Sequence, residues 1–254
     1  MSWRLKRKLI IIGGIVFFFV SFSGLWYWYS RPEPTCFDGK KNGSELDVDC
    51  GGGCARVCSL EVSPVVNLWT RVFEITPNNY TAVSLFNNPN TGLGSPRAEY
   101  LVDYRDTTGR TIATTTGFTF INPGQVIPIF LPNFMSSSTP LEKVFVNFID
   151  INWQRIGRPA PDINVVRTNF EKTPIPRITV RVTNNEVFDL QNVRVVAVLS
   201  DEDNNGFTSS ATIINNIKSK DTVNAYFTWP VPFPIEPTFF DFYVESNVFD
   251  LPQF

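Results

Sequence analysis

The stretch that decides the fold is Ile178–Gly206, with the sequence ITVRVTNNEVFDLQNVRVVAVLSDEDNNG. In Ile178–Val182, apolar and polar residues alternate with a period of two, which is typical of a β-strand. A polar loop containing Asn184–Asn185 follows, and Val193–Leu199 is a second apolar run rich in valine. Asp203–Gly206 then supplies a turn in which glycine can adopt a positive φ. The stretch therefore predicts a strand, a loop, a second strand and a turn.

The same arrangement occurs 97 residues earlier, in Thr81–Gly109. An ungapped offset of 97 aligns many identical residues. Among these pairs are Asn67/Asn164, Phe73/Phe170, Val83/Val180, Asn87-Asn88/Asn184-Asn185, Leu93/Leu190, Arg97/Arg194, Asp106/Asp203, Gly109/Gly206, Val126/Val223 and Phe130/Phe227. So many identities at one offset predict an internal duplication. We expect one domain at residues 60–158 and another at 162–254, separated near Arg158–Pro161, where two prolines discourage regular structure.

Each copy reads as β-structure, with short strands and frequent Asn, Gly and Pro turns over roughly 95 residues. This pattern predicts an all-β exterior part built of two tandem immunoglobulin-like (Ig-like) β-sandwiches. Each copy has a strand ending in Asn-Asn, a strand ending near Asp-x-x-Gly and a strand near Val-x-x-x-Phe. In this respect the copies resemble the FxLYD-type Ig-like domains of bacterial and archaeal surface proteins, and the resemblance implies the same fold.

The N-terminal region contains an uninterrupted apolar run, Leu9–Tyr29, directly behind the basic residues of 4–8. Its 21 residues carry no charge, and at about 1.5 Å per residue they span roughly 30 Å, the thickness of a bilayer's hydrocarbon core. Aromatic residues close the run at the position of a membrane interface. We therefore expect residues 1–31 to form a basic tail and a transmembrane signal anchor. The residues expected to contact lipid include Leu9, Phe18, Trp26 and Trp28.

The basic residues precede the apolar run, so the positive-inside rule predicts a cytoplasmic N-terminus and extracytoplasmic C-terminal domains. A cleaved signal peptide is the competing interpretation. Its apolar region is usually about 7–15 residues and ends in small residues, whereas this run is longer and ends in four aromatic residues. The sequence thus favours a single-pass protein of the cell membrane with an uncleaved anchor.

All four cysteines lie in a neck predicted at residues 32–59: Cys36, Cys50, Cys54 and Cys58. Outside a membrane the redox environment favours disulfides, and four cysteines allow three pairings that the sequence does not distinguish. A zinc site with four thiolate ligands is the alternative. The C-x2-C pairs usual in such sites are missing, so two disulfides are favoured.

The neck sequence CFDGKKNGSELDVDCGGGCARVC resembles a motif of bacterial secreted and surface proteins, C-x-DG-x-x-NG-x-E-x-x-x-DCGG-x-C-x-x-C, with one extra residue before Cys58. The resemblance implies a surface location. Oxygen ligands spaced among glycines also make the neck a candidate Ca²⁺ site. A turn-rich knot held by disulfides alone is the favoured alternative. The candidate ligands are Asp38, Asn42, Glu45, Asp47 and Asp49, and no other cofactor is expected.

Charge and composition exclude some classes of function. Residues 32–254 hold 17 basic and 24 acidic residues, a net charge of −7, which argues against nucleic acid as a partner because its phosphates call for clustered Lys and Arg. The chain has no histidine, so Ser-His-Asp and Cys-His nucleophile systems are excluded. A hydrolase with two carboxylates remains open. The cluster Asp201–Asp203 lies in a predicted turn, where solvation is the simpler role.

We therefore predict a protein that is not an enzyme and that displays two Ig-like modules from a cell envelope. Its expected partners are the membrane, through the N-terminal helix, and an envelope protein or wall polymer. A subunit of a larger envelope membrane assembly is one alternative, and a carboxylate-dependent envelope hydrolase is another.

Overall fold

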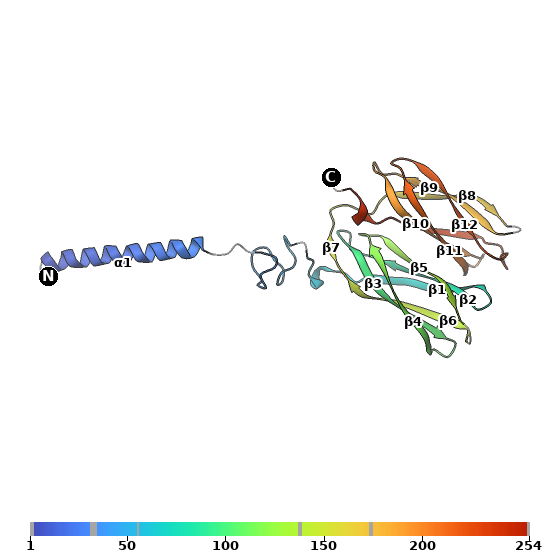
Figure 1. Cartoon of the computed structure of the whole chain (residues 1–254), viewed down its shortest axis with the longest axis horizontal. Coiled ribbons are helices and arrows are strands. Elements are labelled where there is room, and N and C mark those ends of the chain that lie inside the picture. The colour runs from blue at the N-terminus through green and yellow to red at the C-terminus, as the bar shows by residue number, and fades with distance from the viewer. Residues whose placement is uncertain (1–2, 31–34, 55, 137–138, 173–174, 253–254) are drawn as a thin grey trace. The chain divides into compact units, whose positions relative to one another are not determined.

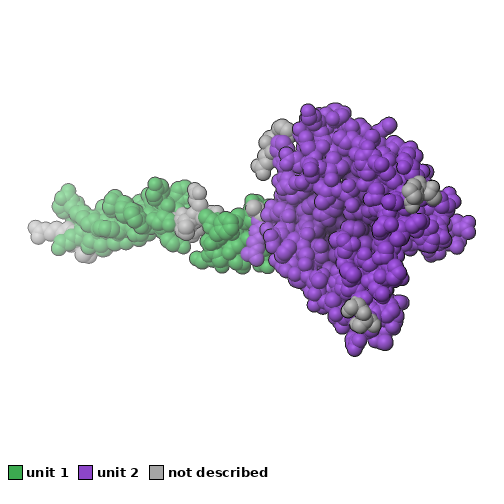
Figure 2. Space-filling model, turned by 45° about the vertical axis from the view of Figure 1, so that its right-hand side comes forward, with its two compact units in different colours: residues 1–54 green, residues 55–254 purple. Residues whose placement is uncertain are grey.

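The computed structural model of this chain describes residues 3–30, 35–54, 56–136, 139–172 and 175–252. The chain forms two compact units, residues 1–54 and residues 55–254 (Figure 2). The first unit holds the predicted anchor and most of the neck. The second holds all the strands, so each unit is described by itself.

The first unit begins with helix α1 (Trp3–Tyr29), which contains the whole predicted apolar run. Among the described residues, one helix is long and apolar enough to cross a membrane, Lys6–Tyr29, and none of that span is buried within the protein. The neck follows as a series of turns with an isolated antiparallel bridge between Asp47 and Cys50. The predicted apolar helix is therefore confirmed.

Disulfides rather than zinc-bound thiolates are present in the neck. Cys36 is bonded to Cys54, Cys50 and Cys58 are also disulfide-bonded, and no cysteine of the described chain is free. A segment this short cannot bury an apolar core of its own, so covalent links replace one.

The second unit is all-β, as the sequence predicts, and begins and ends with short 3-10 helices, η1 (Ser59–Glu61) and η2 (Val248–Asp250) (Figure 1). The first half contains β1 (Val66–Thr76), β2 (Asn79–Asn87), β3 (Leu93–Asp106), β4 (Thr111–Ile121), β5 (Val126–Met135), β6 (Leu141–Ile151) and β7 (Gln154–Arg155). The second half contains β8 (Ile163–Glu171), β9 (Arg177–Asn184), β10 (Leu190–Ser200), β11 (Gly206–Ile217), β12 (Thr222–Thr228) and β13 (Phe239–Glu245).

The described strands form two sandwiches with the same order of pairing. In the first, sheet β1-β2-β5 packs on sheet β4-β3-β6, with β7 added to β3. In the second, β8-β9-β12 packs on β11-β10-β13. Strands β1 to β6 thus correspond in order and pairing to β8 to β13. Each sandwich has its own apolar core, one centred on residues such as Ile127 and Ile129 and the other on Ile178 and Phe227.

The ungapped offset of 97 is wrong in detail, because the two copies are displaced by 95 or 96 residues at several places. Asp106 ends β3 by accepting hydrogen bonds from the amides of Thr108 and Arg110. Asp201 does the same after β10 for Asp203 and Asn205. Asp106 therefore corresponds to Asp201, not to Asp203.

A second departure from the offset of 97 occurs at the end of β2 and of β9, its counterpart in the second copy. The buried side chain of Asn88 donates to the carbonyls of Leu93 and Asn122, and the buried Asn184 donates likewise to Phe188 and Ile217. Asn88 thus corresponds to Asn184, an offset of 96. Because side chains alternate between faces, a slip of one residue exchanges the two faces of a strand.

The aligned pair Val83 and Val180 shows this exchange. Val180 lies in the core of the second sandwich. Val83 instead lies on the face of its sheet that points away from the core of the first sandwich and packs against the second. The same holds for Phe227, which is in a core, and Phe130, which is on that face. The identities at an offset of 97 therefore align residues that lie on different faces of their sheets in the two copies.

A third apolar cluster joins the two sandwiches. Phe73 and Val83 from sheet β1-β2-β5 pack with Val196 and Val198 from sheet β11-β10-β13. The unit therefore has four sheet layers, with these two sheets innermost (Figure 1). Around the cluster lie Trp69, Ile75, Phe130, Ala211 and Tyr243. The sequence predicts two tandem domains, and the structure packs the two sandwiches face to face in one unit.

We predict that Phe73→Ala lowers the free energy of unfolding of residues 55–254 by about 3–5 kcal/mol, as for other buried Phe side chains. Phe73 is 2% exposed, and its cover includes Val196 and Val198 of the other sandwich. The measurement is chemical denaturation of the full chain in detergent micelles. Phe239→Ala is the control, since Phe239 is 45% exposed and its truncation should cost no more than about 0.5 kcal/mol. Equal effects of the two variants would show that the sandwiches do not pack on each other in solution.

Candidate functional site

The neck residues of the candidate calcium site are engaged in local hydrogen bonds. Asp38 Oδ2 accepts from Asn42 Nδ2 at 2.8 Å, and this bond is the main cause that holds the pKa of Asp38 below its usual value. Asp49 accepts from the amides of Asp38 and Gly39. Glu45 accepts from the amide of Asn42, and Asp47 accepts from that of Val48. These carboxylates thus shape the turns of the knot.

The structure brings Asp38, Asn42 and Asp49 near one another and directs Glu45 toward the disulfide. Among the described residues, the group of metal-ligand side chains that converges within 4.8 Å is Cys36, Glu45 and Cys54. Its two sulfur atoms are bonded to each other, so they are not thiolates that could hold zinc. Calcium binding by the neck stays a prediction.

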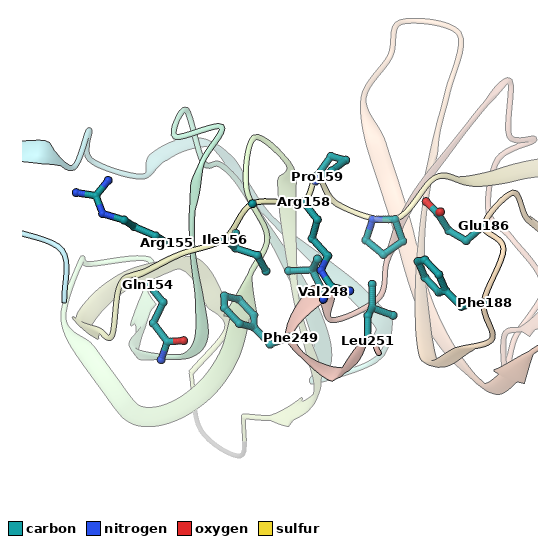
Figure 3. Close-up of a pocket in the computed structure, with 12 residues that line it drawn as sticks. Gln154, Arg155, Ile156, Arg158, Pro159, Glu186, Phe188, Val248, Phe249 and Leu251 are labelled. Carbon is teal, nitrogen blue, oxygen red and sulfur yellow. The ribbon is translucent and has the colours of Figure 1, made fainter. Parts of the chain in front are cut away.

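A pocket of about 630 Å³ lies in the second unit, where the connection between the sandwiches passes the C-terminal helix η2 (Figure 3). Its lining combines polar and charged side chains with apolar ones, the apolar ones being Ile156, Phe188, Val248, Phe249 and Leu251. Prolines of the connection, Pro159 and Pro161, complete one side.

The charged groups of this pocket already have partners. Arg155 forms an ion pair with Glu61 at 2.5 Å, Arg158 donates to the Pro252 carbonyl at 2.8 Å, and Glu186 accepts from the Asp162 amide at 2.9 Å. One carboxylate, Glu186, lines the pocket. The described lining of this pocket does not hold two facing carboxylates, the arrangement used in glycoside hydrolysis.

The predicted carboxylate cluster Asp201–Asp203 lies at the turn between β10 and β11. Asp201 is committed to the two turn amides described above, and Asn204 takes a positive φ of 63°. Asp106 and Gly109 form the matching turn of the first copy. This equivalence gives the cluster a structural role.

Polar contacts fix the two sandwiches in register beside the apolar cluster. Asn122 donates to the Ser246 carbonyl at 2.8 Å and accepts from the Val248 amide at 3.1 Å. Gln125 donates to the Val244 carbonyl. The hydroxyl groups of Thr81 and Ser209, both buried, lie 3.0 Å apart. These directional bonds specify one mutual position of the sheets, which apolar contact alone leaves loosely defined.

A buried ion pair lies next to these contacts. Glu245, 1% exposed, has its Oε1 3.3 Å from Nε of Arg194 on the neighbouring strand, and Arg194 lies 6.0 Å from the ring of Phe120 in the first sandwich. Burial raises the pKa of Glu245 to about 7, and the positive charge of Arg194 only partly offsets that rise. Sequence reasoning missed this pair because each residue looks like an ordinary strand charge until the other sandwich covers it.

The sequence matches no protein-family model and no curated protein. Among solved structures, the transglutaminase of red sea bream is similar over 73% of this chain and 31% of its own, with 8% identity and a TM-score of 0.23. An oxalate decarboxylase variant of Bacillus subtilis is similar over 84% of each chain, with 12% identity and a TM-score of 0.11. This chain thus spans about a third of the transglutaminase. Likeness this weak carries no argument about function, and the resemblance to FxLYD-type domains stays a prediction.

We predict that loss of the Cys36–Cys54 disulfide leaves the sandwiches folded. The double variant Cys36→Ser/Cys54→Ser removes a link that closes 18 residues of chain, worth about 3 kcal/mol to the knot. Trypsin should then cut faster at Lys40 and Lys41, while the far-ultraviolet circular dichroism of the strands is unchanged, because no cysteine follows Cys58. Ser59→Ala serves as the control. Loss of the β-sheet signal in the double variant would contradict this.

We also predict that the second unit is less stable at pH 8 than at pH 5. The folded-state pKa of Glu245 is raised from 4.5 to about 7. The stability that comes from the protonated carboxyl group is therefore fully present below pH 4.5 and is lost as pH rises through 7. The difference amounts to about 3 kcal/mol. Denaturation midpoints across this range measure it. Glu245→Gln should flatten the profile and Asp241→Asn, on the same strand, should not. If stability depends on pH in the same way in Glu245→Gln as in the wild type, a group other than Glu245 causes that dependence.

Proposed function

We propose that this chain is a single-pass membrane protein of a cell envelope whose extracytoplasmic sandwiches bind a protein or a wall polymer. The observation that carries the proposal is α1. Its apolar side chains are exposed, with Phe17 at 74% and Val20 at 66%. A helix apolar all round requires an apolar solvent.

The disulfides support the extracytoplasmic side for the sandwiches. All four cysteines are paired, and such bonds persist in oxidising compartments. The basic residues before the helix, which include Lys6 and Arg7, favour a cytoplasmic N-terminus by the positive-inside rule. A cleaved signal peptide is the competing topology.

Binding rather than catalysis is supported by the form of the second unit. Its two cores and the interface between them are filled with side chains, and each pocket described for it is lined by at most one carboxylate. A carboxylate-dependent hydrolase stays the alternative of a different class, for which two facing carboxylates are required.

A subunit of a larger membrane assembly is the alternative within the binding class. At Gly13 and Gly14, no atom lies within 4 Å of the point that a Cβ atom would occupy, so this face of α1 is open to close approach by another helix. In that case the helix, and not only the sandwiches, would bind partners.

The topology is tested with single cysteines, because the native ones are all paired. We expect Thr168→Cys to react with a membrane-impermeant maleimide in intact cells and Ser2→Cys to react only after permeabilisation. The intact mass should include residues 1–29. A mature chain that begins after Tyr29, or labelling of Ser2→Cys in intact cells, would refute the anchor.

The partner is tested by cross-linking in the native envelope followed by mass spectrometry. Wall polymer or a surface protein attached to residues 55–254 is the expected result. A fixed set of membrane proteins attached through α1 would instead establish the assembly subunit.

A further inference from the structure

Strand β4 forms an open edge of the first sandwich. It is the end strand of the order β4-β3-β6 and pairs with β3 alone. Its pairing runs without a bulge from Ala113, opposite Tyr104, to Thr119, opposite Ala98. The other edge of this stretch therefore presents a regular row of backbone N–H and C=O groups, which is a template for another strand.

Over Ala113–Thr119 this edge has few of the devices that keep edge strands from pairing; the register shift at Ile112 and the Arg97 guanidinium, 3.7 Å from the centre of the Phe118 ring, lie at the two ends of this stretch. Natural proteins place charges, prolines or bulges on open edges, yet Thr111–Ile121 contains no charged residue and no proline. Three successive threonines, Thr114, Thr115 and Thr116, are exposed. Phe118, on the same strand, is 48% exposed.

The remaining described edges of the two sandwiches differ from β4 in length, contacts or composition. Strands β11 and β12 are also uncharged, but they contact each other, and β11 contacts β1 and β2 as well. The others carry charge or proline: Arg71 and Glu74 in β1, Pro128 and Pro132 in β5, Glu142, Lys143 and Asp150 in β6, Arg167 and Glu171 in β8, and Asp241 and Glu245 in β13. Among the uncharged edges, β4 has 11 residues against 7 for β12, and its main contacts are with its own sheet neighbour, β3.

We propose that the free edge of β4 pairs antiparallel with β4 of a second copy of this chain, so that two β4-β3-β6 sheets become one continuous sheet. A two-fold axis between the two β4 strands brings the threonines of one copy opposite those of the other, and Thr–Thr pairs across strands are favourable. A strand without charges matches itself, whereas a charged partner strand would lose hydration at this edge with no counter-charge to meet.

The outward side chains of β4 are known from its register. Thr114 lies opposite Asp103 and Thr116 opposite Leu101, whereas Gly117 lies beneath the ring of Tyr100 on the inner face. Substitution of Thr114 and Thr116 therefore alters the outer surface and the dimer contact without entering the core. Thr222 and Asn224 are the matched pair on strand β12, both exposed and two residues apart.

The test uses the full chain in its native membrane. Thr114→Cys and Thr116→Cys, each the only free thiol, are treated with a short bis-maleimide. Opposed residues across strands have Cβ atoms about 4.5–5.5 Å apart, so at least one variant should give a covalent dimer of two copies. Asn224→Cys should give none.

A second measurement does not depend on the register. The detergent-solubilised chain should have the mass of a dimer by light scattering, and Thr114→Lys/Thr116→Lys should reduce it to a monomer while circular dichroism stays unchanged. Thr222→Lys/Asn224→Lys should leave the dimer intact. A monomeric wild type, a dimer indifferent to the β4 lysines, or cross-linking of β4 to a different protein would each overturn the proposal.

Discussion

The burial of one sheet face against another between the two sandwiches is the constraint on which the rest of the second unit depends. It makes β2 and β10 central strands covered on both sides, and their residues are buried almost without interruption. A strand covered on both faces has no polar side, which explains why Val195–Leu199 is apolar at every position. A single isolated sandwich would have left half of these side chains in water.

The outer faces show the same constraint in reverse. Val198 lies in the interface, three residues before Asp201, and the corresponding residue of the first copy is Asp103, three before Asp106. Leu85, buried three residues before Asn88, corresponds to the exposed Arg181 before Asn184. At both positions the copy covered by the other sandwich has an aliphatic residue and the other copy has a charged one.

The sequence predicts the local structure well because the relevant signals are local. The apolar run Leu9–Tyr29 gives α1, the clustered cysteines give disulfides, and the period-two segments give strands. The packing of the sandwiches is not local: Val83 and Val180 look equivalent, yet a slip of one residue turns them toward different layers. Nothing adjacent to Glu245 indicates that the distant Phe120 lies near its ion pair. The sequence identifies the neck carboxylates as a cluster. Their backbone hydrogen-bond partners, however, depend on turn geometry, which composition does not specify.

Duplication also explains why one edge strand is left open. β4 and β11 are the same strand of the two copies, and both are free of charge. In the second copy, β11 lies against β1 and β2 of the first sandwich, so its lack of charge suits a covered position. In the described chain, no sandwich precedes the first copy. Strand β4 is therefore uncharged like β11 but has no second sandwich against it. The neighbouring strand β3 carries Asp103 and Glu99, whereas β4 itself carries no charge. An uncharged edge of this kind is prone to uncontrolled pairing with other strands. Its presence in the first copy is explained if another strand covers β4 in the assembled protein.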